Sequence, residues 1–211
     1  MLIERPPRLF RLLFPSGCLF RKKMKGRRCV YLTFDDGPIP EITPLVLDIL
    51  DGAGAKATFF AVGDNARRYP ELIEEIRRRG HHIGNHTMHH LKGMSTNTET
   101  YLRDVEEASG HLGGTRLFRP PHGLLTAKQA RLLMKDYTIV LYDLVTRDYS
   151  RKTTAEDIVR NVMRYTRNGS VIVFHDSLKS APKLGYALPE ALRWLRDKGY
   201  EFALLPEPEQ H

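Results

Sequence analysis

From residue 30 onward, the sequence alternates short apolar runs with stretches that carry helix signals, and this alternation constrains the fold more than any other feature. Several of the apolar runs are almost uninterrupted, which is typical of parallel strands covered on both faces. Seven such β-then-α units follow one another without a repeat or a low-complexity linker, and they predict one parallel α/β domain. The predicted strands span residues 30–34, 57–62, 81–84, 117–120, 138–143, 170–175 and 201–205.

Helix boundaries are marked by residues that cap helix ends. Thr96 and Thr153 are each followed three residues later by a glutamate, Glu99 and Glu156, which is the capping-box pattern of a helix start. Gly80 follows a helical stretch, as is typical of the residue just after a helix. These signals place helices between the predicted strands.

Length and composition exclude several classes of protein. The chain has 211 residues, of which 41% are hydrophobic and 27% charged, values close to those of ordinary globular domains. Two cysteines are too few for a disulfide framework or a four-cysteine zinc module. No run approaches the roughly 18–20 consecutive apolar residues that a membrane-spanning helix needs. We therefore expect one globular domain with a substantial core.

The net charge of +8 is confined to the start of the chain. Residues 1–28 contain nine Lys and Arg residues and a single acid, Glu4, whereas positive and negative charges balance over the remaining residues. Leucine and phenylalanine residues are interleaved with these cations. We therefore divide the chain into a basic, Leu/Phe-rich N-terminal arm, residues 1–27, and a neutral domain, residues 28–211, that carries the candidate catalytic residues.

The composition of the arm favours some roles over others. It does not predict a conventional signal peptide, because Arg11 interrupts the candidate apolar core and basic residues stand where a cleavage site belongs. The apolar residues could cover the domain while the cations stay solvated, or residues 1–28 could contact an anionic membrane surface peripherally. Nucleic acid is the weakest alternative, because the neutral domain offers no extended basic face. We therefore expect a cytoplasmic or peripherally membrane-associated protein without a nucleic-acid partner.

Polar residues with catalytic potential fall at the carboxyl ends of the predicted strands, where parallel barrels and doubly wound sheets build active sites. They are Asp35, Asp36, His86, His90, Arg119, Asp148 and His175. Scattered surface charges would not coincide with strand ends in this way, so we expect these residues to form one site.

A metal site is predicted by two histidines and an aspartate pair. His86 and His90 are four residues apart, so a helical turn would aim both imidazoles at one cation. A carboxylate from Asp35 or Asp36 would complete a site with two histidines and one carboxylate, and would leave one coordination position open for water. The other carboxylate would remain free to act as a base.

Two motifs carry a resemblance to a known family, TFDDGP at residues 33–38 and NHTxxH, where x is any residue, at residues 85–90. They are followed in order by RPP at 119–121, DY at 148–149 and VFHD at 173–176. In these motifs the chain resembles the polysaccharide deacetylase (NodB-homology) family, also called carbohydrate esterase family 4. The resemblance spans residues 28–205 and implies a distorted, incomplete (β/α)7 barrel of the TIM-like type, in agreement with the seven units.

The resemblance implies a metal-dependent deacetylase. Asp36, His86 and His90 would bind one divalent ion, usually zinc, with cobalt, nickel or manganese as alternatives. Asp35 would be the general base that deprotonates the attacking water, and His175 the general acid that protonates the departing amine. The implied reaction removes N-acetyl groups from the amino sugars of chitooligosaccharides, peptidoglycan or related glycans, and releases acetate.

The resemblance implies supporting roles for two further residues. Arg119 is expected to orient Asp35, and Asp148 to orient His175, although each could instead be an ordinary salt-bridge or loop residue. Asp176 we interpret as a cap of the following turn, outside the site.

Four positions are implied to contact substrate. A backbone N–H near Pro121 and His122 would stabilise the oxyanion, Tyr149 would stack on a sugar ring, and Val173 would line the pocket for the acetyl methyl group. The chain departs from the family here, because many members have Tyr in place of His122, Trp in place of Tyr149 and Leu in place of Val173. The departures concern substrate preference rather than reaction type.

Two functions other than deacetylation of a glycan are compatible with parts of the sequence. Deacylation of a lipid-linked amino sugar, or of another amide at the membrane surface, would fit the basic arm and the missing signal peptide. A non-catalytic carbohydrate-binding relative would typically have lost the metal ligands and acid–base residues, which are intact here. The implied partner is an N-acetylated carbohydrate, and the sequence gives no prediction of oligomeric state.

Overall fold

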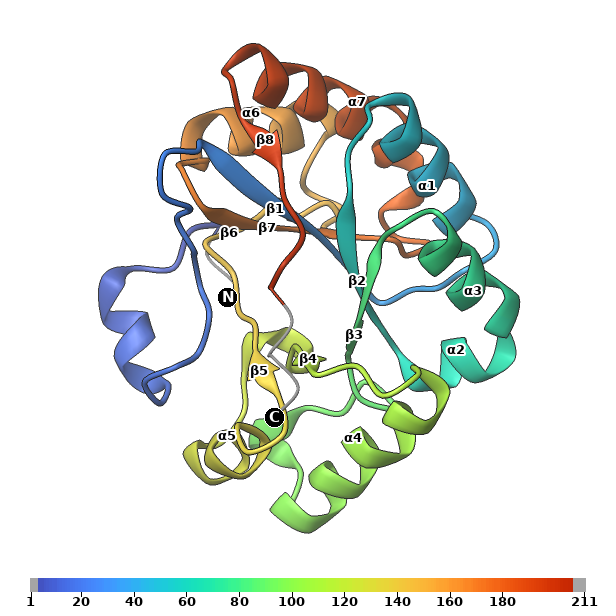
Figure 1. Ribbon diagram of the computed structural model, residues 1–211, viewed down its shortest axis with the longest axis vertical. Helices are drawn as coiled ribbons and strands as arrows, with labels where there is room; N and C mark the ends of the chain where they lie inside the picture. Colours follow the sequence, from blue (N-terminus) through green and yellow to red (C-terminus); the bar gives the residue numbers. More distant parts are fainter. Residues whose placement is uncertain (1–3, 207–211) are drawn as a thin grey trace.

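The strands form one curled parallel sheet in the computed structural model, which describes residues 4–206 (Figure 1). The strand order is β5-β4-β3-β2-β1-β7-β6, and β8 pairs with the first residues of β1 before β2 begins to pair with it. The strands are β1 (Cys29–Asp35), β2 (Ala57–Ala61), β3 (His82–Asn85), β4 (Leu117–Phe118), β5 (Thr138–Ile139), β6 (Leu144–Val145), β7 (Ser170–His175) and β8 (Glu201–Phe202).

The helices lie around the outside of this sheet, as Figure 1 shows. They are α1 (Thr43–Gly52), α2 (Gly63–Arg68), α3 (Pro70–Arg78), α4 (Thr98–His111), α5 (Ala127–Leu133), α6 (Ala155–Tyr165) and α7 (Ala181–Asp197), with three short 3₁₀ helices, η1 (Arg8–Leu13), η2 (Gly93–Ser95) and η3 (Pro121–Gly123). Among the helices of residues 4–206, none combines the length and apolar character needed to cross a bilayer. The predicted incomplete parallel barrel is therefore confirmed.

Strand alternation decides which side chains of β1 face the interior of the barrel. Successive side chains of a strand point to opposite faces. Phe34 packs outward under the helices, where its ring stacks on Phe59 at 5.1 Å and on Phe174 at 5.6 Å between ring centroids. Tyr31 belongs to a separate buried cluster on the other face of the strand. Asp35 is four residues further along, so its side chain points to the same face as that of Tyr31. The same alternation that builds the core therefore places the Asp35 carboxylate inside the mouth of the barrel.

One predicted strand is divided in the structure. The apolar run 138–143 pairs with β4 only over Thr138–Ile139, and the short strand β6 was not predicted. The run changes partner as it crosses the opening of the barrel. The Val140 N–H still donates to Phe118 of β4, the Leu141 N–H donates to Leu19, and the Asp143 N–H donates to Val171 of β7. A continuous apolar run cannot reveal such a change of partner, because residues 139–143 are all buried whichever strand they pair with.

The N-terminal segment fills this opening. Leu19 forms a parallel bridge with Val140, and Arg21 forms an antiparallel bridge with Ser170. In Figure 1, η1 lies in the gap that the helices leave between α5 and α6. Of residues 1–27, those that the structure describes thus pack against the barrel, and the predicted division at residue 27 stays a prediction.

The apolar residues of this segment divide into a buried and an exposed set. Phe14 and Phe20 are buried, and their rings meet edge to face at 5.6 Å between centroids. Leu9, Leu12 and Leu13 are 74%, 78% and 68% exposed. The phenylalanines therefore cover the domain, as one predicted role required, while the leucines form a separate apolar surface.

Two helices begin one residue later than predicted. The α6 capping box uses Thr154 and Asp157 in place of Thr153 and Glu156, and α4 is capped by Asn97, whose side chain accepts a hydrogen bond from Thr100. In each case the neighbouring residue is also a good cap, so the sequence pattern specified the helix start only to within one residue.

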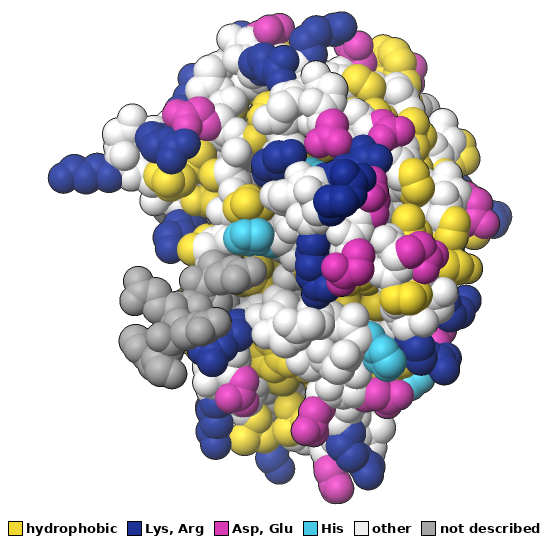
Figure 2. Space-filling view, turned by 45° about the vertical axis from the view of Figure 1, so that its right-hand side comes forward, with side chains coloured by type: hydrophobic (Ala, Val, Ile, Leu, Met, Phe, Trp, Pro, Cys, Tyr) yellow, Lys and Arg dark blue, Asp and Glu magenta, His cyan; other side chains and the backbone are white. Residues whose placement is uncertain are grey.

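Charges on the helical surface are balanced locally. On the face that Figure 2 brings forward, Lys and Arg side chains are interspersed with Asp and Glu. Arg79, which follows α3, reaches Asp48 and Asp51 of α1 at 2.7 and 3.0 Å. Within α3, Arg78 pairs with Glu75 at 2.5 Å. Neighbouring helices of the domain are thus linked by mutually compensating charges.

Candidate active site

A cavity of about 230 Å³ lies at the carboxyl ends of the strands. It brings together six of the seven polar residues that the sequence placed at strand ends, and Asp148 lies behind His175. Its lining consists of Asp35, Asp36, His86, His90, Arg119, His122, Gly123, Leu141, Tyr142, Val145, Tyr149, Val173, His175 and Lys179.

Three side chains in this cavity could hold a metal ion. One ligand atom each from Asp36, His86 and His90 lie within 4.8 Å of one another. The Oδ1 atom of Asp36 is 3.2 Å from Nε2 of His90 and 3.8 Å from Nε2 of His86. The His86 Nδ1 atom contacts the carbonyl oxygen of Arg119 at 2.7 Å, and it must donate because a carbonyl only accepts. Nε2 of His86 is then the unprotonated nitrogen that a metal requires.

The two histidines are not presented by the helical turn that their spacing predicted. The segment 86–90 is a loop, in which Thr87 and His90 have positive φ angles of 66° and 55°. Side-chain bonds rather than helix geometry hold this shape, because Thr87 N–H donates to the Asn85 side chain and Leu91 N–H to the Thr87 hydroxyl. The helical-turn interpretation is therefore wrong, although both histidines do face the same point.

Asp104 of α4 is a second support of this loop, and the sequence interpretation missed it. Its Oδ2 atom accepts the backbone N–H groups of Met88 and His89 at 2.9 and 3.0 Å, and its Oδ1 contacts His89 Nδ1 at 2.6 Å. No sequence signal identifies it, because its burial, at 6% exposed, and its contacts with the loop arise only in the folded chain.

Asp36 lies in a loop after β1, and Asp176, the residue after β7, fixes this loop in place. Asp176 Oδ1 accepts the Gly37 N–H at 3.2 Å, and Oδ2 accepts the Thr43 hydroxyl at 2.6 Å. The contact is so close that a Cβ at Gly37 would lie 1.9 Å from Asp176 Oδ2, so only glycine fits. From the sequence we interpreted Asp176 as a turn cap, but it supports the loop that follows β1. Asp36, which begins this loop, has a positive φ of 81°.

Asp35 forms a buried ion pair with Arg119. The Arg119 Nη1 atom donates to Asp35 Oδ1 at 2.6 Å and to the Thr33 hydroxyl at 2.8 Å, and its remaining guanidinium nitrogens donate to the carbonyls of Val140 and Leu141. Both partners of the pair are 5% exposed or less. Because Arg119 also contacts His86 through its carbonyl, one residue fixes both the carboxylate and a candidate metal ligand.

His175 forms a second buried pair, with Asp148. Its Nδ1 atom is 2.8 Å from Asp148 Oδ1, and its backbone N–H donates to Oδ2 at 2.7 Å. Burial lowers the pKa of His175, but the charge and hydrogen bond of Asp148 outweigh burial and raise the pKa to about 9. The imidazole is therefore protonated at neutral pH. Asp148 contacts its Nδ1 atom and not its Nε2 atom.

The pKa values of two candidate metal ligands, His86 and Asp36, are lowered. Burial lowers the pKa of His86 to about 4, which keeps its imidazole neutral. Burial alone would raise the pKa of Asp36, but the hydrogen bond with His90 and the nearby histidine charges hold it well below its usual range. A neutral imidazole beside an ionised carboxylate is the donor set that a divalent cation binds.

The predicted substrate residues lie on two sides of the cavity. Val173 packs with Tyr142 and Val145 in a small apolar cluster that Tyr149 joins. His122 has a φ of 60°, and its ring centroid lies 4.9 Å from that of His90. Pro121 lines the neighbouring groove rather than this cavity.

The geometry is that of a hydrolase active site. The mouth of an open parallel barrel contains a cluster of two histidines and one aspartate, an Arg-bound carboxylate and an Asp-bound histidine. The sequence profile described as polysaccharide deacetylase matches residues 22–141, more than half of the chain. The chain belongs to the polysaccharide deacetylase family, and it is a deacetylase of the kind that this family comprises.

Similar proteins cover most of the chain. A peptidoglycan-N-acetylglucosamine deacetylase of Bacillus cereus is 32% identical over 92% of this chain and 94% of its own. A chitooligosaccharide deacetylase of Azorhizobium caulinodans is 32% identical over 72% of this chain and 75% of its own. Among solved structures, the peptidoglycan N-acetylglucosamine deacetylase Bc1960, in complex with 4-naphthalen-1-yl-N-oxidanyl-benzamide, aligns with a TM-score of 0.85. That alignment has 31% identity and covers 90% of this chain and 91% of the other.

Proposed function

We propose that this protein removes N-acetyl groups from the amino sugars of peptidoglycan or a related glycan, and that it uses a zinc ion held by Asp36, His86 and His90. The observation that carries the proposal is the arrangement of one cavity, in which an Arg-bound carboxylate, an Asp-bound histidine and this cluster meet. The names of the relatives support the substrate class, because they act on peptidoglycan N-acetylglucosamine and on chitooligosaccharides.

The residues present fit a divalent ion. Two imidazoles and one carboxylate match a catalytic zinc site with an open position, and the Nδ1–H of His86 is fixed as such sites require. The compound bound by Bc1960 is a hydroxamate, a group that chelates metal ions. When bound, the ion would polarise the acetyl carbonyl and make water more acidic.

Asp35 is the group that we assign to accept the proton of the attacking water. Arg119 holds its Oδ1 atom, so Oδ2 is the oxygen that we assign to the proton. The ion pair fixes the direction of the carboxylate, as a general base requires.

His175 is the group that we assign to donate a proton to the departing nitrogen. An amine leaves an amide only when its nitrogen is protonated, and His175 carries the necessary proton at neutral pH because its pKa is raised to about 9. Asp148 holds Nδ1, so the proton is delivered from Nε2.

The apolar cluster of Tyr142, Val145 and Val173 is the part of the cavity that fits the acetyl methyl group. Tyr149 packs edge to face against His175, with 4.8 Å between ring centroids, and extends this wall toward the sugar. A small acyl pocket beside an aromatic wall suits an acetylated sugar better than a longer acyl chain.

The experiment is a comparison of amine release from the tetramer of N-acetylglucosamine (below, chitotetraose) and from peptidoglycan fragments by the zinc-loaded protein. We expect release from at least one of them, with an equal amount of acetate, and loss of release in His175→Ala. Release of reducing sugar without acetate would contradict deacetylation, and equal activity of His175→Ala would contradict the assigned acid.

A further inference from the structure

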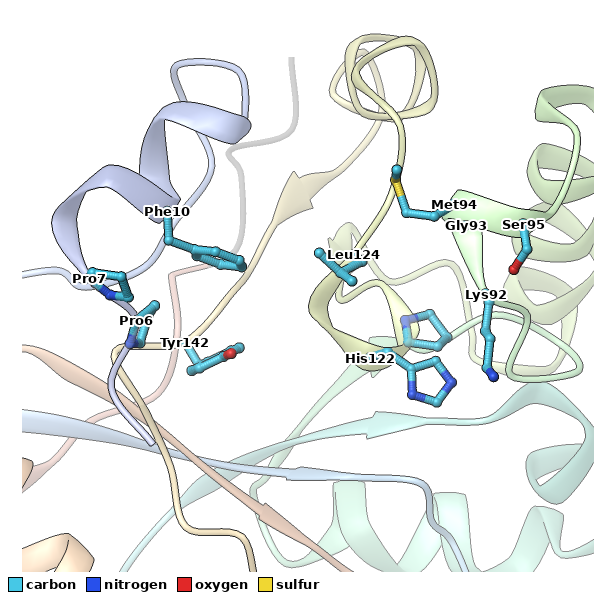
Figure 3. A pocket seen from close by; sticks show the side chains of 11 residues that line it. Pro6, Pro7, Phe10, Lys92, Gly93, Met94, Ser95, His122, Leu124 and Tyr142 are labelled. Atoms are coloured by element: carbon cyan, nitrogen blue, oxygen red, sulfur yellow. The ribbon is translucent and has the colours of Figure 1, made fainter. Parts of the chain in front are cut away.

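An apolar groove of about 460 Å³ adjoins the catalytic cavity (Figure 3). His122 and Tyr142 line both, so the two spaces lie side by side. Nothing in the reaction at the acetyl group requires this second space. A ligand that occupies both spaces would place its acetyl group in the cavity and another part of its structure in the groove.

The groove has two walls from distant parts of the chain. In Figure 3, Phe10 and Tyr142 lie on one side, with Met94 and Leu124 on the other. Pro6 and Pro7 continue the first wall. Side chains that donate several hydrogen bonds, which a run of sugar hydroxyls would need, are scarce in this lining, whereas hydrocarbon surface dominates it.

The wall formed by the N-terminal segment is anchored at both ends. On one side of Pro6, the Glu4 carbonyl accepts the Val145 N–H at 2.8 Å, and its carboxylate pairs with Arg147 at 2.8 Å. On the other side, Arg11 pairs at 2.9 Å with Asp143, which is fully buried. The wall is therefore a fixed part of the groove and not a loose tail lying across it.

Positive charge lies where the groove meets the cavity. Lys92 lines the groove and Lys179 lines the cavity. Both side chains are exposed, and each shares the lining of its own space with His122, which lines both. The junction therefore complements an anionic group between a sugar in the cavity and a chain in the groove.

We propose that the groove binds the hydrocarbon chain of an amphiphilic substrate, in which an N-acetylated amino sugar is joined to an aliphatic chain through a phosphate. The inference rests on the proposed function, because the sugar's acetyl group must occupy the catalytic cavity. The phosphate lies beside Lys92, and the chain contacts Phe10 and Met94. The exposed Leu9, Leu12 and Leu13 of η1 extend apolar surface beyond Phe10, as a substrate anchored in a lipid layer would need.

The test compares three substrates of the zinc-loaded protein of residues 1–211: chitotetraose, and the methyl ester and the octyl ester of N-acetylglucosamine 1-phosphate. The octyl ester is used below its critical micelle concentration. We expect its KM to be at least about tenfold lower than that of the methyl ester, because several buried methylene groups each contribute to binding. Phe10→Ser and Met94→Ser should each reduce this ratio severalfold and leave the methyl ester's kcat/KM unchanged.

Two further variants separate the parts of the proposal. Lys92→Gln should raise the KM of both phosphate esters and leave chitotetraose unaffected. Leu12→Ser is the matched control, because Leu12 is on the same short helix as Phe10 but does not line the groove, and it should keep the full octyl-to-methyl ratio. Because Met94 is 62% exposed, its variant tests the groove even if Phe10→Ser folds poorly.

The outcomes distinguish this inference from the proposed function. Equal KM values for the octyl and methyl esters, or a ratio that Phe10→Ser and Met94→Ser both leave intact, would overturn the groove proposal alone. Absence of acetate release from all three substrates would overturn the proposed function, and the groove proposal with it.

Discussion

At the scale of single residues, each candidate catalytic group is paired with another side chain that fixes its direction. Arg119 binds Asp35, and Asp148 binds His175. The sequence predicted these pairings only through the family resemblance, since the partners are 84 and 27 residues apart. It predicted neither Asp104 nor Asp176 as a support, because their bonds to backbone N–H groups of other segments form only in the folded chain.

The roles of Asp35 and Asp36 are separable by mutation. Asp35→Asn should retain metal at the wild-type level and lower kcat by about 10²–10⁴-fold, because it removes a general base but no candidate ligand. Metal content by mass spectrometry and the rate of acetate release would be measured on the same samples. His86→Ala is the control that should lose metal. If Asp35→Asn lost as much metal as His86→Ala, the assignments of base and ligand would be reversed.

The pair of His175 and Asp148 predicts the alkaline limb of the pH profile. A general acid must be protonated, so activity should fall as the pH rises through the pKa of about 9. Asp148→Asn removes the charge that raises this pKa, while burial, which lowers it, remains. The alkaline limb of kcat should therefore move to lower pH in this variant, as measured by initial rates between pH 6 and 10. An unmoved alkaline limb would contradict the assignment of His175.

At the scale of elements, the carboxyl ends of β1, β3 and β7 bring the site together, while loops give it its final shape. The strand assignments were predictable from apolar runs, except where residues 138–145 change partners between β4, Leu19 and β7. The loop shapes were not predictable, because positive φ angles at Asp36, Thr87 and His90 are imposed by surrounding contacts against the preference of these residue types.

The support of the Asp36 loop by Asp176 is testable through metal affinity. Asp176→Ala removes the acceptor of the Gly37 N–H and the Thr43 hydroxyl, so zinc affinity should fall by about 10–100-fold. The measurement is competition with a zinc chelator of known affinity. Ser177→Ala is the matched control, since its hydroxyl pairs with Ser180 instead. Equal zinc affinities in the two variants would contradict the role of Asp176.

At the scale of the whole molecule, the N-terminal segment completes the barrel and adds a wall beside the active site. Its composition predicted apolar cover or membrane contact, and the structure contains buried phenylalanines as well as exposed leucines. Leu19 and Phe20 stand between Cys18 and Arg21, a stretch too short to show a strand or helix period. For that reason the pairing of Leu19 with Val140 could not be predicted from sequence.

Peripheral contact of this segment with an anionic membrane stays a prediction. Replacement of Leu9, Leu12 and Leu13 by serine should lower binding to phosphatidylglycerol vesicles severalfold in sedimentation assays, because the three side chains are exposed. The thermal midpoint should stay near the wild-type value, since none of the three is buried. Equal binding of the variant and wild type would exclude these leucines as a membrane contact.

We expect one metal ion held by Asp36, His86 and His90 to make this cavity a deacetylase centre, and a metal titration is the decisive measurement. The protein would be stripped with a chelator and titrated with zinc, while bound metal and acetate release from chitotetraose or the octyl ester are measured together. We expect no acetate release without metal, and a linear rise in release that saturates at one zinc per chain and is absent in His86→Ala. Full activity of the stripped protein, or saturation that His86→Ala leaves unchanged, would contradict it.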